Sequence, residues 1–399
     1  MFNAIKIYED MYWVGANDRR IELFENSYPV PYGVSYNSYL ILDEKNILLD
    51  GVDSSVTAQF IDNIKTVLKG QDLHYVIINH MEPDHCSGFV ELALHYPNIK
   101  FIGNVKTLKI LQQFYTNLSE KSFITVAEGD SFTTGKHSFH FYLAPMVHWP
   151  EVMVTYDSSS KTLFSADAFG TFGALNGNLY FDEIADKEFY FSESRRYYSN
   201  IVGKYGPQTL ALLKKAAALD IALICPLHGP IWRSDFEQLI GRYQKWAAYQ
   251  PEEQSVTIAY GSVYGNTQQA AEKLAQLLAE KGVKNIKVYD VAKTHPSYIL
   301  ADAFRTSVLA CLSATYNNGL FAATETFLLE FAGHNVANRK IALVENGTWS
   351  PQANKLMEGM VGSLKNTTIL EPKITIHSAC KEETIEQLEI LAENIKNSL

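Results

Sequence analysis

The sequence predicts an α/β protein of two domains, and three observations support this. The chain has 399 residues, which exceeds what one hydrophobic core usually spans. In the first part, strand-like runs come in pairs joined by turns, which favours an α/β sandwich. In the second part, strands and helices alternate regularly, which is typical of a doubly wound parallel sheet.

Apolar runs mark the strands expected in the first part, at residues 33–52, 73–80, 98–104, 137–146, 151–167 and 221–229. Helical patterns lie between them, at 54–69, 86–96 and 205–219. After the polar segment 249–255, which contains Pro251, five β-α units follow. Their strands are expected at 256–261, 286–291, 307–313, 340–346 and 373–378, each followed by a helix. We therefore expect domains of residues 1–250 and 251–399.

Composition excludes several classes of protein. A net charge of −10 is a poor match for nucleic acid, which selects basic faces. The four cysteines form no C-x-x-C pair, so neither a disulfide framework nor a metal site made of cysteine alone is expected. The N-terminus lacks the pattern of a signal peptide, and no apolar run approaches the length of a membrane span. We expect a cytoplasmic protein.

The run H-M-E-P-D-H at 80–85 places two imidazoles and two carboxylates directly after an apolar strand. Charged groups at the end of a buried strand need partners or a cation. Three later residues also end apolar runs, and strand ends on one rim of a sheet converge. We therefore expect one metal site, made of His80, Glu82, Asp84, His85, His148, Asp167 and His228.

These ligands comprise three carboxylates and four imidazoles, without a thiolate. Such a set suits two divalent ions of iron or manganese, and zinc also binds nitrogen and oxygen donors. A single histidine at a strand end is more often a hydrogen-bonded structural residue, so only the whole cluster indicates a metal. The other histidines lack this context and are interpreted as structural or solvated.

A second site is expected in the loop 261–269, between a strand and a helix. Its glycines allow close backbone approach, and the helix N-terminus favours an anion. The loop has neither the G-x-G-x-x-G pattern nor the lysine of a nucleoside triphosphate loop, which favours a monophosphate.

Two further loops, 313–321 and 345–351, follow neighbouring strands, where open α/β sheets bind ligands. Tyr316 and Trp349 offer aromatic faces for stacking. Any one of these loops alone is better interpreted as an ordinary turn, and it is the three together that indicate a flavin. The expected cofactor-binding residues are Ser262, Val263, Tyr264, Gly265, Asn266, Thr267, Ser313, Ala314, Thr315, Tyr316, Asn317, Asn318, Gly319, Asn346, Gly347, Thr348 and Trp349.

The histidine–carboxylate run and the later His, Asp and His resemble the metallo-β-lactamase superfamily, whose hydrolases carry H-x-H-x-D-H. Glu82 stands where those enzymes have a histidine, and in this the chain is similar to the flavodiiron proteins, or A-type flavoproteins. The segments HWPEVM (148–153), FSADAFG (164–170) and PLHGPIWR (226–233) also match. The second half resembles flavodoxin, from which Tyr264 and Ala314 depart. The resemblance implies an αββα metallo-β-lactamase-like sandwich and a flavodoxin-like doubly wound five-stranded parallel sheet.

The resemblance also implies the cofactors and their ligands. FMN would occupy the second domain. One iron would take His80, Glu82 and His148, and the other Asp84, His85 and His228. Asp167 would bridge the two irons, together with an oxo or hydroxo group.

The implied activity is the reduction of dioxygen to water, of nitric oxide to nitrous oxide, or of both. Electrons would come through FMN from a separate donor, such as rubredoxin or reduced coenzyme F420, because no such module is expected after Leu399. The implied assembly is a head-to-tail homodimer or a dimer of dimers, which brings the FMN of one subunit beside the irons of the other.

Two alternatives stay open on the residues alone. One is a zinc metallohydrolase with an accessory flavodoxin domain, against which Glu82 and the flavin loops argue. The other is an electron carrier with a vestigial first domain, against which the complete ligand set argues. The same ligands serve dioxygen and nitric oxide, so the sequence leaves the preferred substrate undetermined.

Overall fold

The computed structural model describes residues 3–116, 118 and 122–399, and these form two compact units. One unit holds the chain up to Tyr198 and Pro207–Tyr243, and the other holds Ser199–Gly206 and Gln244–Leu399. The short segment Ser199–Gly206, which leads into helix α6 (Gly206–Ala216), thus packs with the second unit. Among the helices of the described residues, none has the length and apolar character needed to cross a membrane.

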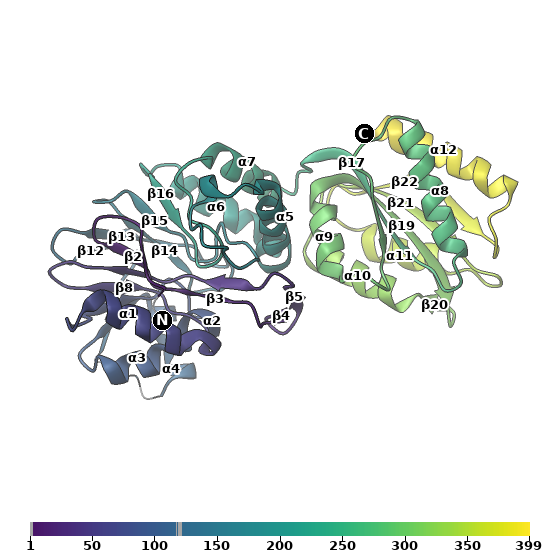
Figure 1. Cartoon of the computed structure of the whole chain (residues 1–399). Coiled ribbons are helices and arrows are strands. Elements are labelled where there is room, and N and C mark those ends of the chain that lie inside the picture. The colour runs from purple at the N-terminus through teal and green to yellow at the C-terminus, as the bar shows by residue number, and fades with distance from the viewer. Residues whose placement is uncertain (1–2, 117, 119–121) are drawn as a thin grey trace. The chain divides into compact units, whose positions relative to one another are not determined.

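Two sheets form the centre of the first unit (Figure 1). The larger sheet has the order β1 (Ile5–Lys6), β2 (Met11–Trp13), β7 (Tyr39–Ile41), β8 (Ile47–Leu49), β9 (Tyr75–Ile77), β10 (Lys100–Gly103) and β11 (Phe123–Thr125). The other has the order β12 (Ser131–Thr133), β13 (Ser138–Leu143), β14 (Met153–Asp157), β15 (Thr162–Phe164) and β16 (Leu223–Cys225). Two small ribbons pair β3 (Ala16–Asp18) with β6 (Val34–Tyr36) and β4 (Leu23–Phe24) with β5 (Tyr28–Pro29).

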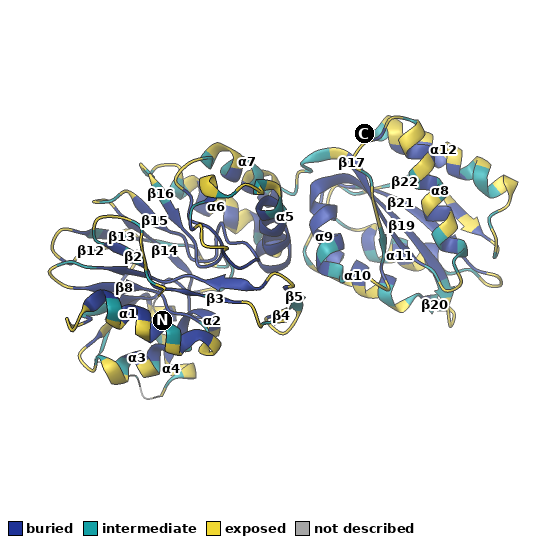
Figure 2. Cartoon of the chain, viewed as in Figure 1, coloured by how far each residue is buried: buried dark blue, intermediate teal, exposed yellow. Residues whose placement is uncertain are grey.

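Helices cover the outer side of each sheet (Figure 1). The larger sheet carries α1 (Thr57–Leu68), α3 (Phe89–His95) and α4 (Val105–Phe114), and the other carries α5 (Lys187–Tyr197), α6 (Gly206–Ala216) and α7 (Phe236–Ala247). The strands between these layers are largely buried, as Figure 2 shows. The expected αββα sandwich is confirmed. Short helical turns complete it at α2 (Pro83–Cys86), Ser54–Val56, Phe181–Glu183, Tyr198–Val202 and Gly203–Tyr205.

The second unit is a parallel sheet in the order β18 (Lys287–Asp290), β17 (Glu253–Gly261), β19 (Thr306–Tyr316), β21 (Lys340–Asn346) and β22 (Thr368–Ile376). A short strand, β20 (Gly319–Leu320), pairs antiparallel with the end of β19. Helices α8 (Asn266–Glu280) and α12 (Glu382–Ser398) pack together, and α9 (Pro296–Arg305), α10 (Ala322–Gly333) and α11 (Ala353–Val361) form another group. The doubly wound five-stranded sheet that the sequence predicts is confirmed.

Several elements differ from the patterns in the sequence. The helix expected over 86–96 is shorter and forms α3 at Phe89–His95 with Gly88 as its N-cap, whereas Cys86 ends the separate short helix α2. Helix α4 was not expected, although Asn104 is a good N-cap and accepts hydrogen bonds from the backbone N–H of Lys106 and Thr107. The long run 33–52 forms three short strands because the chain turns twice within it.

Arg339 stabilises the second unit from inside. Its side chain is buried and donates hydrogen bonds to the carbonyls of Ala303 (2.8 Å), Phe304 (2.7 Å) and Tyr249 (2.7 Å). Burial lowers the pKa of Arg339 to about 9. The guanidinium thus joins the end of α9 to the segment that enters β17, and its desolvation is offset by carbonyl dipoles.

His137 is a buried residue that joins elements of the first unit, as Arg339 does in the second. Its Nδ1 lies 2.7 Å from Asp157 Oδ2 and its Nε2 lies 3.2 Å from Asp10 Oδ2, while Lys136 pairs with Asp10 at 2.7 Å. Burial alone would lower the pKa of His137, but Asp157 and Asp10 raise it above its ordinary value of 6.5. The imidazolium therefore ties the start of β13 to β14 and to the turn before β2.

We predict that His137→Gln destabilises the protein by about 3–5 kcal/mol near pH 6, because it removes one partner of a buried ion pair. The folded-state pKa is raised, so this stabilisation is complete below about pH 6.5 and is lost as the pH rises through the folded pKa. Urea unfolding of both proteins from pH 6 to 9 should show the difference shrinking. A difference that is constant over this range would show that His137 acts through packing alone.

Candidate metal centre and cofactor cavity

The seven expected metal ligands all lie in the first unit, in segments that follow strands. His80 and Glu82 follow β9, and Asp84 and His85 lie on α2. His148 lies in the connection between β13 and β14, Asp167 follows β15, and His228 follows β16. Both sheets therefore contribute ligands to one place.

Their donor atoms form two groups, within each of which all atoms lie within 4.8 Å of one another. One group is His80, Glu82, His148 and Asp167, and the other is Asp84, His85 and His228. The carboxylate of Asp167 faces both. Its Oδ2 lies 3.1 Å from His80 Nε2 and 3.2 Å from His148 Nε2. Its Oδ1 lies 3.3 Å from His85 Nε2 and 3.7 Å from His228 Nε2.

The cluster contains buried ionisable groups for which the protein supplies too few hydrogen-bond partners. Both oxygens of Asp84 and of Asp167 and the Nε2 atoms of His85 and His228 are buried without a hydrogen-bond partner. Such groups are costly unless a cation joins them. Burial alone would raise the pKa of Asp167, but His80 and its neighbours hold it well below the ordinary range, so this carboxylate is ionised. The residues present therefore fit a pair of metal ions bound by oxygen and nitrogen.

A buried network fixes the end of β9, where the ligand run begins. Asp50 accepts hydrogen bonds from Asn79 N (2.7 Å), Asn79 Nδ2 (2.8 Å) and His80 N (3.2 Å). Thr155 on β14 donates to Asn79 Oδ1 at 2.7 Å, which joins the two sheets beside the cluster. Burial raises the pKa of Asp50 to about 6.

His228 is fixed from the other side. Its Nδ1 lies 2.8 Å from the carbonyl oxygen of Ser35, so its Nε2 faces Asp84 and Asp167. Gly229 follows with φ +80, and a Cβ there would lie 2.0 Å from the side chain of Thr171. Only glycine allows the chain to turn away directly after this ligand candidate.

A cavity of about 930 Å³ opens onto the cluster, with Glu82, Asp84 and His148 on its wall. No sequence pattern pointed to its other polar residues, which include Arg20, Glu25 and Tyr36. Glu25 lies in the tight turn between β4 and β5 with φ 50. Burial and the neighbouring Glu82 raise the pKa of Glu25 to about 8. Glu25 is far from the ligand run in the sequence, and the fold brings it to the cavity beside Glu82.

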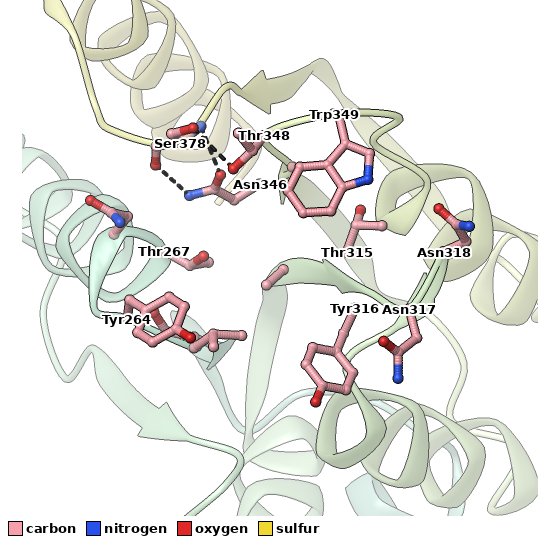
Figure 3. Close-up of a pocket in the computed structure, with 15 residues that line it drawn as sticks. Tyr264, Thr267, Thr315, Tyr316, Asn317, Asn318, Asn346, Thr348, Trp349 and Ser378 are labelled. Atoms are coloured by element: carbon pink, nitrogen blue, oxygen red, sulfur yellow. Dashed lines mark hydrogen bonds between the residues drawn. The ribbon is translucent and has the colours of Figure 1, made fainter.

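In the second unit, a cavity of about 530 Å³ lies at the carboxyl ends of the parallel strands (Figure 3). All three expected loops contribute to it, and its lining is Ser262, Val263, Tyr264, Asn266, Thr267, Ala314, Thr315, Tyr316, Asn317, Asn318, Asn346, Gly347, Thr348, Trp349 and Ser378. The expected residues Gly265, Ser313 and Gly319 are absent from this lining. Gly265 caps α8, Ser313 hydrogen-bonds Thr324, and Gly319 pairs with Tyr316.

Ser378 is a lining residue that the sequence analysis missed. It follows β22, so its signal was its place at the end of the fifth strand. Asn346 donates to the carbonyl of Ser378 at 2.9 Å, and Ser378 N donates back to Asn346 Oδ1 at 3.2 Å (Figure 3). Ser378 therefore joins a fourth loop to the third.

The cavity offers separate surfaces for an anion and for an aromatic ring. Helix α8 begins beside it without an acidic residue in its first turn, and the N-terminus of such a helix favours a phosphate. Trp349 and Tyr316 stand on opposite sides of the space in Figure 3, and they are 77% and 51% exposed. This arrangement fits a flat ring that carries one phosphate.

Comparison with known proteins agrees with both sites. Residues 34–229 match the family model described as "ODP family beta lactamase", and residues 258–389 match the flavodoxin model. An anaerobic nitric oxide reductase flavorubredoxin of Aeromonas hydrophila is 31% identical, over 87% of this chain and 70% of that protein.

Solved structures of similar proteins superpose on almost the whole chain. The rubredoxin oxygen:oxidoreductase of Desulfovibrio gigas superposes with a TM-score of 0.93 at 26% identity, over 99% of this chain and 98% of that one. The flavodiiron protein of Giardia intestinalis superposes with a TM-score of 0.92 at 25% identity, over 98% and 97%. The chain therefore belongs to the flavodiiron proteins, which join a metallo-β-lactamase-like domain to a flavodoxin-like domain.

Proposed function

We propose that this chain reduces dioxygen to water, nitric oxide to nitrous oxide, or both, at a diiron centre that receives electrons through FMN. Family membership supports the broader statement that the chain is an oxidoreductase with FMN and non-haem iron as cofactors. The names of its relatives include a nitric oxide reductase and a rubredoxin oxygen:oxidoreductase, which supports both substrates.

The observation that carries this proposal is the position of Asp167 between two groups of ligands. We assign His80, Glu82 and His148 to one iron, Asp84, His85 and His228 to the other, and Asp167 to both as a bridge. When bound, such a pair supplies electrons and open coordination positions to a small diatomic molecule. The protein's part is to orient His80 and His228 through their Nδ1 atoms and to keep the cluster buried, with the cavity beside Glu82 as a route of access.

In the second unit, we assign the phosphate of FMN to Ser262, Asn266 and Thr267 at the start of α8. The isoalloxazine ring is assigned to the space between Tyr316 and Trp349. Ser262 Oγ already accepts a hydrogen bond from Gly265 N at 3.1 Å, which holds the loop in the form a phosphate needs. The remaining expected residues of the three loops supply polar contacts at the edge of the ring. The proposed domains are 1–250 for the irons and 251–399 for FMN.

Further parts of the proposal concern partners. The electron donor is a rubredoxin-like protein or reduced F420, and the assembly is a head-to-tail homodimer or a dimer of dimers. Tyr264 and Trp349, which are 92% and 77% exposed beside the cavity, offer apolar area for such a contact.

Sedimentation equilibrium should give a mass of two or four chains, and a monomer would contradict the assembly. We place the protein in the cytoplasm, where its four free cysteines stay reduced.

We predict that Asp167→Ala and His148→Asn abolish turnover and lower the iron content from about two ions per chain, whereas FMN stays bound. Iron and flavin are measured on the same samples. Asp157→Asn is the matched control, because Asp157 is also a buried carboxylate beside a histidine. Wild-type protein that binds two zinc ions and consumes no oxygen would instead support the metallohydrolase alternative.

We predict that Trp349→Ala weakens FMN binding by about 1–3 kcal/mol, since it removes a stacking face. Iron content should not change. Leu329→Ala, at an exposed leucine on α10 outside the cavity lining, is the control. Equal FMN affinity in Trp349→Ala and wild type, measured by fluorescence titration, would remove this tryptophan from the flavin site.

We predict rapid reoxidation when anaerobic, FMN-reduced protein is mixed with dioxygen or with nitric oxide in a stopped-flow instrument. Comparable rates would indicate dual use, and a large bias would identify the preferred substrate. Nitrous oxide is measured in the second mixture. Slow reoxidation by both gases, in protein that contains iron and FMN, would contradict the proposed function.

A further inference from the structure

Glu151 lies directly behind His80 and is not one of the expected metal ligands. Its side chain is buried, and its Oε1 lies 2.8 Å from His80 Nδ1. The other ring nitrogen of His80, Nε2, lies 3.1 Å from Asp167 Oδ2 and 3.2 Å from Glu82 Oε2. His80 therefore spans from the carboxylates of the cluster to a carboxylate outside it.

The hydrogen-bond directions follow from this position. If Nε2 gives its lone pair to a metal, the ring proton must be on Nδ1, which then donates to Glu151 Oε1. Met81 N lies 3.1 Å from His80 Nδ1 and 2.9 Å from Glu151 Oε1. With Nδ1 protonated, the Met81 N–H donates to Glu151, so this oxygen accepts two hydrogen bonds.

The segment that carries Glu151 is itself held in place. Asn104, the N-cap of α4, donates to the carbonyl of Glu151 at 2.5 Å, and Lys106 donates to the carbonyl of Pro150 at 3.2 Å. The ring of Trp149 meets the ring of His80 edge-on, with centroids 5.4 Å apart. The imidazole is thus fixed by one hydrogen bond and one aromatic contact from the same short segment.

The two carboxylate oxygens of Glu151 have different surroundings. Its Oε1 meets His80 Nδ1 at 2.8 Å and Met81 N at 2.9 Å. Its Oε2 is buried without a hydrogen-bond partner among the described residues. Glu151 also lines a cavity of about 320 Å³ together with Asn104, Pro150 and Val152. The contact with His80 is therefore made by one oxygen of a carboxylate that the protein encloses.

The second group has no carboxylate hydrogen-bonded to an imidazole Nδ1 among the described residues, and the carboxylate of Asp50 acts on His85 only through its charge. His228 Nδ1 meets a neutral carbonyl oxygen, that of Ser35, at 2.8 Å. His85 Nδ1 is buried and meets no acceptor among the described residues. Each group has one carboxylate of its own, Glu82 or Asp84, so the difference between the two groups lies behind the imidazoles.

We propose that Glu151 is a positioning residue that fixes the orientation and the protonated nitrogen of His80 and strengthens it as a metal donor. As a result, the position of His80, Glu82 and His148 holds its metal ion more tightly than the position of Asp84, His85 and His228. A carboxylate behind a ligating imidazole raises the basicity of the ligand, and loss of such a partner commonly costs about 10- to 100-fold in metal affinity. This inference rests on the proposed dinuclear site.

The test is an anaerobic titration of the metal-depleted full chain with Co²⁺, followed by its visible absorption. Wild type should fill in two steps of different affinity. Glu151→Gln keeps the shape and loses the charge, so its tighter step should weaken by about 10- to 100-fold. Glu151→Asp keeps the charge and should recover part of the affinity. Asp157→Asn, which removes a carboxylate from His137 Nδ1, should leave both steps unchanged.

A second readout separates positioning from mere stability. After loading with ⁵⁷Fe²⁺, Glu151→Gln should change the Mössbauer spectrum of one of the two irons, whereas the control should match wild type. Two unchanged Co²⁺ affinities and an unchanged spectrum in Glu151→Gln would overturn the inference and leave the proposed function intact. Wild type that binds only one metal ion would overturn both.

Discussion

The buried carboxylate of Asp167 is the interaction on which the metal-binding unit depends. Four imidazole Nε2 atoms point toward its two oxygens, from strand ends in both sheets. Such an assembly of buried ionisable groups is stable only when opposite charges and hydrogen bonds compensate the loss of water. Two cations supply what the protein atoms lack, so we expect metal binding and the stability of this unit to be linked.

Around this centre, the fold holds the ligand candidates His80 and His228 through groups outside the cluster. Asp50 and Asn79 fix the backbone where the ligand run begins, and Ser35 fixes the ring of His228. Glu151 does the same for His80, but with a charge instead of a neutral dipole. The outer groups therefore hold the imidazoles in place, and in our proposal they also make the two metal positions differ.

The second unit uses other forces to hold its cofactor. Its parallel sheet directs four loops to one edge, where the start of α8 offers backbone N–H groups to a phosphate and exposed rings offer stacking faces. No described residue of its cavity lining is a carboxylate or a lysine. Binding here thus depends on dipoles and aromatic contact, whereas the first unit depends on charge.

Sequence periodicity predicted the second unit almost strand by strand, because buried parallel strands are continuous apolar runs and each helix has one apolar face. It predicted the first unit less completely. Helix α4 depends on the single cap residue Asn104, and most strands there have only two or three residues, too few for a clear pattern.

The seven ligand candidates could be chosen from the sequence because metal chemistry restricts residue types and strand ends converge. The assignment of His148, Asp167 and His228 to the two groups came only from the resemblance, since spacing along a chain does not say which distant atoms meet. Neither residue type nor spacing pointed to Glu25, Ser35 or Glu151, because an isolated glutamate or serine in a loop resembles any other; Glu151 was marked only as part of the matching segment HWPEVM. The sequence determined by itself which residues could bind metal and flavin. Only the tertiary structure decided which groups stand behind them, because those contacts join segments far apart in the chain.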